Sequence, residues 1–100
     1  MHLIFCSVLF LLQILIRDDK GFFLMVEAGR VDTAHHETTA RRALAEAVEL
    51  DHTVEKIIEL LGDQLDETLI IVTADHSHTM TIAGYPDRGT NIVGKGIHCA

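Results

Sequence analysis

The sequence predicts an α/β fold, built from one βαβ unit that is preceded by an N-terminal helix. Two short apolar runs, residues 21–26 and 68–73, flank a long segment in which apolar residues recur every three or four positions. Short continuous apolar runs suit strands buried on both faces, whereas the longer periodic pattern suits an amphipathic helix. Strand, helix and strand in this order predict two parallel strands joined by a right-handed crossover.

The composition places limits on size and partners. One hundred residues leave room for one small domain, and 15 acidic against 8 basic residues give a formal net charge of −7. This charge argues against nucleic acid or an anionic membrane surface as a partner, because both require clustered basic residues. With 48% hydrophobic residues and one proline, the chain is expected to fold. Its two cysteines, Cys6 and Cys99, make neither a disulfide framework nor a metal knuckle.

The N-terminal residues 3–16 are nearly all apolar. This run is shorter than the roughly 20 residues that cross a bilayer. It also has no preceding basic residue and no following small-residue cleavage site, both of which a signal peptide would show. The favoured interpretation is a buried helix over residues 11–17 that ends in a charged turn at residues 17–21, closed by Gly21. Residues 1–10 are left unassigned.

The long periodic segment predicts a helix over about residues 38–61. Gly62 stands where a left-handed residue commonly ends a helix. The second β-branched run, residues 68–73, predicts the second strand. The Gly-rich residues 81–100 predict an irregular tail with a turn at residues 84–89. The apolar stripe of the helix consists of Ala40, Ala43, Leu44, Ala47, Val48, Val54, Ile57, Ile58 and Leu61.

Histidines and carboxylates gather after both predicted strands. Glu27 follows the first strand and leads into residues 32–36, and residues 75–78 follow the second. Because parallel strands present their carboxyl ends at one sheet edge, the two clusters are expected to meet there. Asp32 and His36 are four residues apart, so on a helical turn they can share one metal ion. A carboxylate such as Glu27 suits Mg²⁺, and mixed imidazole and carboxylate sets suit Zn²⁺.

Several of these residues also have simpler interpretations. Asp32 or Thr33 could cap the N-terminus of a helix, a role compatible with metal binding. His36 precedes a glutamate, but the second histidine of a H-E-x-x-H metalloprotease motif is missing. His52 lies among charges within the predicted helix and is expected to be solvated. His98 has no partner nearby in the sequence.

Two long segments resemble one protein family. Residues 21–37, GFFLMVEAGRVDTAHHE, and residues 68–78, TLIIVTADHSH, are similar in the same order to the two metal-binding segments of alkaline phosphatases. Residues 84–89, GYPDRG, resemble the loop that follows in animal members. The resemblance implies that residues 11–94 are a partial alkaline-phosphatase-like domain. It also implies a fragment of the parallel-sheet core of that family, with residues 95–100 as an unassigned tail.

Carried over position by position, the resemblance implies a set of metal ligands. Glu27 would bind one Mg²⁺. Asp32 and His36 would bind one Zn²⁺, and Asp75 and His76 would bind another. The implied cofactors are therefore two zinc ions and one magnesium ion.

Other positions in the two segments have supporting roles or depart from the family. His35 and His78 align beside ligands, which implies that they orient those ligands. Arg30 is expected to make a structural ion pair. Ala28 and Ala34 replace glycines that are common in the family, and each adds one methyl group to the backbone.

The resemblance implies hydrolysis of small phosphate monoesters through a phosphoserine intermediate. It further implies a homodimer at the outer cell face, held there by a lipid anchor. In the family the nucleophilic serine, a bridging aspartate and a phosphate-binding arginine lie upstream, and a third zinc-binding histidine lies downstream. We therefore expect a partial sequence without a catalytic nucleophile. The alternatives are a catalytically inert metal-binding α/β fragment, or a related metal-dependent phosphodiesterase or sulfatase.

Overall fold

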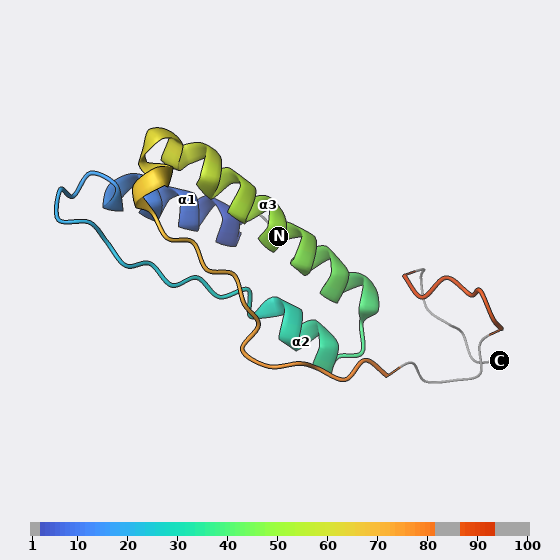
Figure 1. The fold of residues 1–100 in the computed structure, drawn as a ribbon. Helices are drawn as coiled ribbons and strands as arrows, with labels where there is room; N and C mark the ends of the chain where they lie inside the picture. The colour runs from blue at the N-terminus through green and yellow to red at the C-terminus, as the bar shows by residue number, and fades with distance from the viewer. Residues whose placement is uncertain (1–2, 82–86, 94–100) are drawn as a thin grey trace.

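The protein, seen in a computed structural model that describes residues 3–81 and 87–93, is built from helices joined by extended segments (Figure 1). Helix α1 spans Leu3–Leu15, the short α2 spans Arg30–His36, and the long α3 spans Ala40–Leu61. A 3₁₀ helix, η1, follows directly at Gly62–Glu67. Helix α3 packs against both α1 and α2, so it forms the centre of the fold.

The predicted α/β fold is wrong, because residues 3–81 and 87–93 contain no β-strand. The two segments predicted as strands are extended and run in the same direction, from the η1 end of the molecule towards α2 (Figure 1). No backbone hydrogen bond joins residues 21–26 to residues 68–73. A parallel sheet is stable when several strands pair and helices cover both faces. Two segments and one long helix do not meet that requirement, so the predicted βαβ unit does not form.

Without a sheet, most of the large apolar side chains of both extended segments are exposed to solvent. Phe23 is 89% exposed and Leu69 is 84% exposed, although their sequence pattern predicted burial on both faces. The other large apolar side chains that are exposed in these segments are Phe22, Met25, Ile71 and Val72.

Helix α1 extends further towards the N-terminus than predicted. It begins at Leu3 rather than residue 11 and ends at Leu15 rather than residue 17. Among its residues 6–15, Val8 and Leu12, one turn apart, have buried side chains where α1 packs against α3. The predicted turn after it is confirmed: Gly21 has φ +77° and its N–H donates to the Asp18 carbonyl. None of the helices in the described ranges is long and apolar enough to cross a membrane.

The helix predicted from the long periodic pattern is confirmed as α3, although α3 begins two residues later than predicted. Thr38 has φ +52°, a left-handed conformation that a right-handed helix cannot include, so α3 begins at Ala40. At the other end Gly62 adopts φ +51° and closes the helix, as predicted. Only part of the apolar stripe is covered, since Ala43 and Leu61 are buried while Leu44, Val48 and Ile58 are exposed.

We expect Leu12→Ala to destabilise the protein by about 2–5 kcal/mol, the usual cost of truncating a buried leucine. Leu12 is 2% exposed, so its truncation leaves a cavity between α1 and α3. The measurement is urea unfolding followed by far-ultraviolet circular dichroism. Leu11→Ala is the matched control, because Leu11 is 48% exposed and its truncation should cost about 1 kcal/mol or less. Equal losses for the two variants would contradict the packing of α1 on α3.

Part of the predicted tail lies outside the described residues. This holds for residues 82–86 and 94–100, and therefore for the first half of the predicted turn at residues 84–89 and for His98 and Cys99. Residues 87–93 are irregular, as predicted. Within them the Thr90 N–H donates to the Asp87 carbonyl, and Gly89 has φ +90°.

Candidate metal centre

Helix α2 positions the first group of candidate ligands. Gly29 is its N-cap residue, so Asp32 and Thr33 lie inside the helix and neither caps its N-terminus. The Thr33 hydroxyl donates to the Gly29 carbonyl at 3.1 Å, within the first turn. Ala34 is 3% exposed, and α2 packs against α3, so the Ala34 methyl group fills part of the core.

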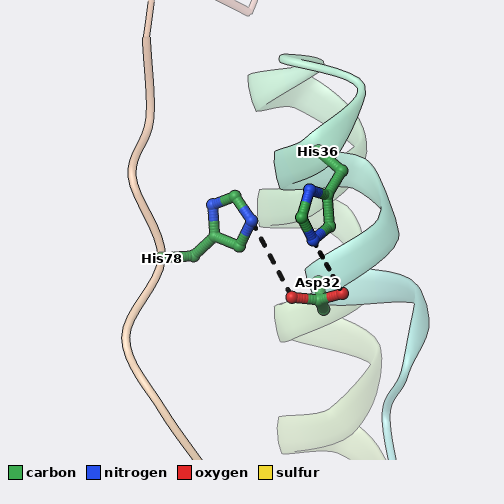
Figure 2. Close-up of side chains that lie close together, drawn as sticks. All are labelled: Asp32, His36 and His78. Atoms are coloured by element: carbon green, nitrogen blue, oxygen red, sulfur yellow. Dashed lines mark ion pairs between the residues drawn. The ribbon is translucent and has the colours of Figure 1, made fainter.

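Asp32 is the point on which the histidines converge. His36 lies one turn further along α2, with its Nε2 3.5 Å from Asp32 Oδ2. The extended segment after η1 passes beside α2 and brings two more imidazoles: His76 Nε2 lies 3.9 Å and His78 Nε2 3.8 Å from Asp32 Oδ1. Figure 2 shows the Asp32 carboxylate with His36 on its own helix and His78 on the neighbouring segment. Residues more than 40 positions apart in the sequence therefore share one site.

The inner oxygen of Asp32 has no hydrogen-bond partner among the described residues. Asp32 Oδ1 is buried, yet no hydrogen-bond donor within the described ranges reaches it. A buried carboxylate oxygen without a hydrogen bond is costly, and a bound cation would remove that cost. The residues present therefore fit a divalent metal ion at this position.

The histidine rings are held so that one nitrogen stays available. His76 Nδ1 lies 3.0 Å from the Ser77 carbonyl oxygen, and His78 Nδ1 lies 2.6 Å from the Thr79 carbonyl oxygen. A carbonyl oxygen only accepts hydrogen bonds, so in both rings Nδ1 carries the proton. In the neutral ring Nε2 then keeps its lone pair, and in both residues Nε2 is the nitrogen that faces Asp32.

The surroundings of His76 favour its protonated form. The hydrogen bond to the Ser77 carbonyl raises the pKa of His76 above its usual 6.5, and the negative charges of Asp75 and Asp32 raise it further, partly offset by desolvation. The Asp75 carboxylate lies 3.2 Å from His76 Nε2. A proton therefore competes with a cation for this nitrogen up to a higher pH than at an ordinary histidine.

The remaining residues that the sequence singled out make local contacts or lie on the surface. Glu27 follows the first extended segment, and its carboxylate lies over Gly29. A Cβ atom added to Gly29 would lie 3.1 Å from Glu27 Oε1. His35 Nδ1 donates to the Val31 carbonyl, and its ring stacks on that of His78. His52 is exposed on α3, as predicted. Arg30 forms no ion pair with another described residue, contrary to the prediction.

The sequence predicts that the two clusters meet and that His78 orients a ligand, but it does not indicate that Asp32 is the residue His78 faces. His76 and His78 are two residues apart in an extended segment, so their side chains emerge on the same side of the chain. That spacing was the available signal. A carboxylate facing several imidazoles is a donor set that suits a divalent metal ion, so the class that this site defines is a candidate metal-binding protein.

Comparison with known proteins identifies the family within this class. The alkaline phosphatase family model matches residues 8–98. The chain is 46% identical over 83 residues to the membrane-bound alkaline phosphatase of Bombyx mori, and 49% identical over 83 residues to the human tissue-nonspecific isozyme. The chicken tissue-nonspecific isozyme is 48% identical over the same length. The chain therefore belongs to the alkaline phosphatase family.

The matches cover most of this chain but little of its relatives. In each case the aligned region is 83% of this chain, and it amounts to 15–16% of the relative. No solved structure gives a significant match.

Proposed function

We propose that this chain supplies metal-binding segments of an alkaline phosphatase active site, and that the function of the site is to hydrolyse phosphate monoesters. The observation that carries the proposal is the meeting of Asp32 with imidazoles from two separate segments around an unpartnered carboxylate oxygen. Membership of the alkaline phosphatase family supports the choice of reaction over a phosphodiesterase or sulfatase.

The proposed metal assignment follows the sequence positions. Asp32 and His36 hold one zinc ion, Asp75 and His76 hold a second, and Glu27 contributes to a magnesium site. When bound, divalent ions of this kind supply Lewis-acid stabilisation of the charge on the phosphoryl oxygens. Each pair of zinc ligands combines one carboxylate with one imidazole, a donor set that suits zinc.

The remaining interactions hold these side chains in place. The Nδ1–H groups of His35 and His76 donate to backbone carbonyls, which determines which ring nitrogen is free. The i, i+4 spacing places Asp32 and His36 on one face of α2, and packing at Ala34 holds α2 against α3. These contacts orient ligands before a cation binds, so little side-chain entropy is lost on binding.

Substrate, assembly and location are proposed with the same function. We propose small phosphate monoesters as substrates, a homodimer as the assembly, and the outer cell surface as the location. The Bombyx mori relative is named a membrane-bound alkaline phosphatase, which supports the proposed location.

The proposed function can be tested in a chimera. The 83 aligned residues of the human tissue-nonspecific isozyme are exchanged for those of this chain, and hydrolysis of a chromogenic phosphate ester is measured. We expect an active chimera in which Asp75→Asn lowers kcat/KM by more than about 100-fold, since even outer groups around a metal change activity about 10–100-fold. His52→Ala is the control and should leave activity unchanged, because His52 is exposed on α3. A folded chimera without activity, or full activity with Asp75→Asn, would contradict the proposal.

A further inference from the structure

We propose that Thr38 makes the joint between α2 and α3 a strained hinge, about which α2 opens more readily than the rest of the fold. The hinge is a property of the backbone between the two helices, so it goes beyond the proposed function and depends on no reaction and no bound ion. Three features carry it: the conformation of Thr38, the hydrogen bonds that impose this conformation, and the weak attachment of α2.

The backbone of Thr38 is left-handed. With φ +52° it is the only non-glycine residue of positive φ in the part of the chain that the structure describes. A left-handed backbone brings Cβ close to the following carbonyl oxygen, a contact that glycine avoids because it has no Cβ. Threonine is branched at Cβ, so this conformation is especially unfavourable for it. The strain is therefore located at one residue of the joint.

The hydrogen bonds of the joint impose this conformation on Thr38, which lies directly after Glu37, the C-cap residue of α2. The Thr38 N–H donates to the His35 carbonyl and the Thr39 N–H donates to the Ala34 carbonyl, both at 2.9 Å. These two bonds form a Schellman motif, which ends a helix with a left-handed residue, most often glycine, at the position that Thr38 occupies. Thr39 is already the N-cap residue of α3, so no further residue can share the change of direction.

The side chain of Thr38 does not compensate for the strain. It is exposed, and its hydroxyl makes no hydrogen bond with another described residue. Arg42 and Glu37 form an ion pair across the joint at 2.5 Å, but their side chains are 50% and 46% exposed, and exposed ion pairs contribute little stability. The strain therefore remains as a cost of the closed joint, and opening the joint releases it.

Helix α2 has few other contacts that hold it closed. It has seven residues, a length at which a helix is not stable by itself in water, and Ala34 is its buried residue. Helix α3, by contrast, has 22 residues and four buried side chains. Elements with few buried contacts open locally at a lower free-energy cost than the core does. Opening at Thr38 would carry Asp32 away from residues 75–78 and expose its Oδ1, which is buried while the joint is closed.

The strain is tested by replacing Thr38 in the 100-residue chain and following thermal unfolding by circular dichroism. We expect Thr38→Gly to raise Tm by about 2–8 °C, because relief of the left-handed strain exceeds the extra conformational entropy that glycine loses on folding. Thr38→Asn should raise Tm by part of this amount, since asparagine tolerates the left-handed region. Thr38→Val keeps the branched shape without the hydroxyl and should leave Tm within about 2 °C of that of the parent chain. Thr39→Gly, the matched control, should lower Tm, because Thr39 has φ −101° and no strain to relieve.

Hydrogen exchange of single amides tests whether the joint opens as a hinge. In the parent chain we expect the Thr39 N–H, which donates to Ala34, to be less protected than the N–H of Thr53 in the middle of α3. Thr38→Gly should increase the protection of the Thr39 N–H by about 2–10-fold, because opening then releases no strain.

Two kinds of result would overturn the hinge. An unchanged or lower Tm for Thr38→Gly and Thr38→Asn, or an equal rise for Thr38→Val, would show that the joint is not strained at Thr38. A higher Tm without a gain in protection at Thr39, or equal protection of the Thr39 and Thr53 amides in the parent chain, would show that α2 does not open about this residue. Neither measurement involves a metal or a substrate, so the proposed function is judged separately by the chimera.

Discussion

Replacement of Asp32 by asparagine is expected to weaken zinc binding by the 100-residue chain by more than about 100-fold. Asp32 is the group on which three imidazoles converge, at 3.5–3.9 Å from its two oxygens. Asparagine keeps the shape of the side chain and removes its charge, so the change isolates the electrostatic contribution of the ligand. Loss of a ligand should exceed the roughly 10–100-fold effect of groups that only support one. Isothermal titration calorimetry with Zn²⁺ measures the change.

Asp51→Asn is the matched control for this prediction. Asp51 is an exposed aspartate on α3 with no histidine partner among the described residues, and its replacement removes the same charge. We expect zinc affinity to remain within about twofold of that of the parent chain, because exposed charges at a distance are screened by salt. Similar losses in the two variants would mean that net charge, and not the site at Asp32, determines zinc binding.

The 100-residue chain by itself is expected to hydrolyse no phosphate monoester above the rate of zinc-containing buffer. Its metal ligands would provide one element of catalysis, whereas the activated nucleophile and the phosphate-binding group are separate requirements. The exposed apolar side chains of the two extended segments add a second obstacle, because they favour association over a single rigid site. The measurement follows a chromogenic phosphate ester at alkaline pH with Zn²⁺ and Mg²⁺ present.

Turnover that Asp32→Ala abolishes would contradict this prediction. It would show that another hydroxyl of this chain, or a metal-bound water, can act as the nucleophile. Ser77, between His76 and His78, would be the first hydroxyl to replace. Turnover that survives Asp32→Ala would indicate a contaminating phosphatase. The active chimera serves as the positive control, because it places the same segments in a complete enzyme.

Features that depend on residues close together in the sequence could be predicted from the sequence. The apolar period of α3 and the glycines at positions 21 and 62 determine a helix and its flanking turns, because both act through local backbone preference. The i, i+4 spacing placed Asp32 and His36 on one helical face, and α2 holds them there. The order of the two histidine-rich segments was enough to indicate the alkaline phosphatase family, which the family model confirms.

Only the tertiary structure decided the features that depend on distant partners. Residues 21–26 and 68–73 have the composition of strands, but a strand requires hydrogen-bonding neighbours, and these segments have none among the described residues. The burial of Asp32 Oδ1 and the position of His78 beside it likewise depend on the path of the segment after η1. Local preference sets the conformation of a segment, whereas its neighbours in space are set by packing around α3.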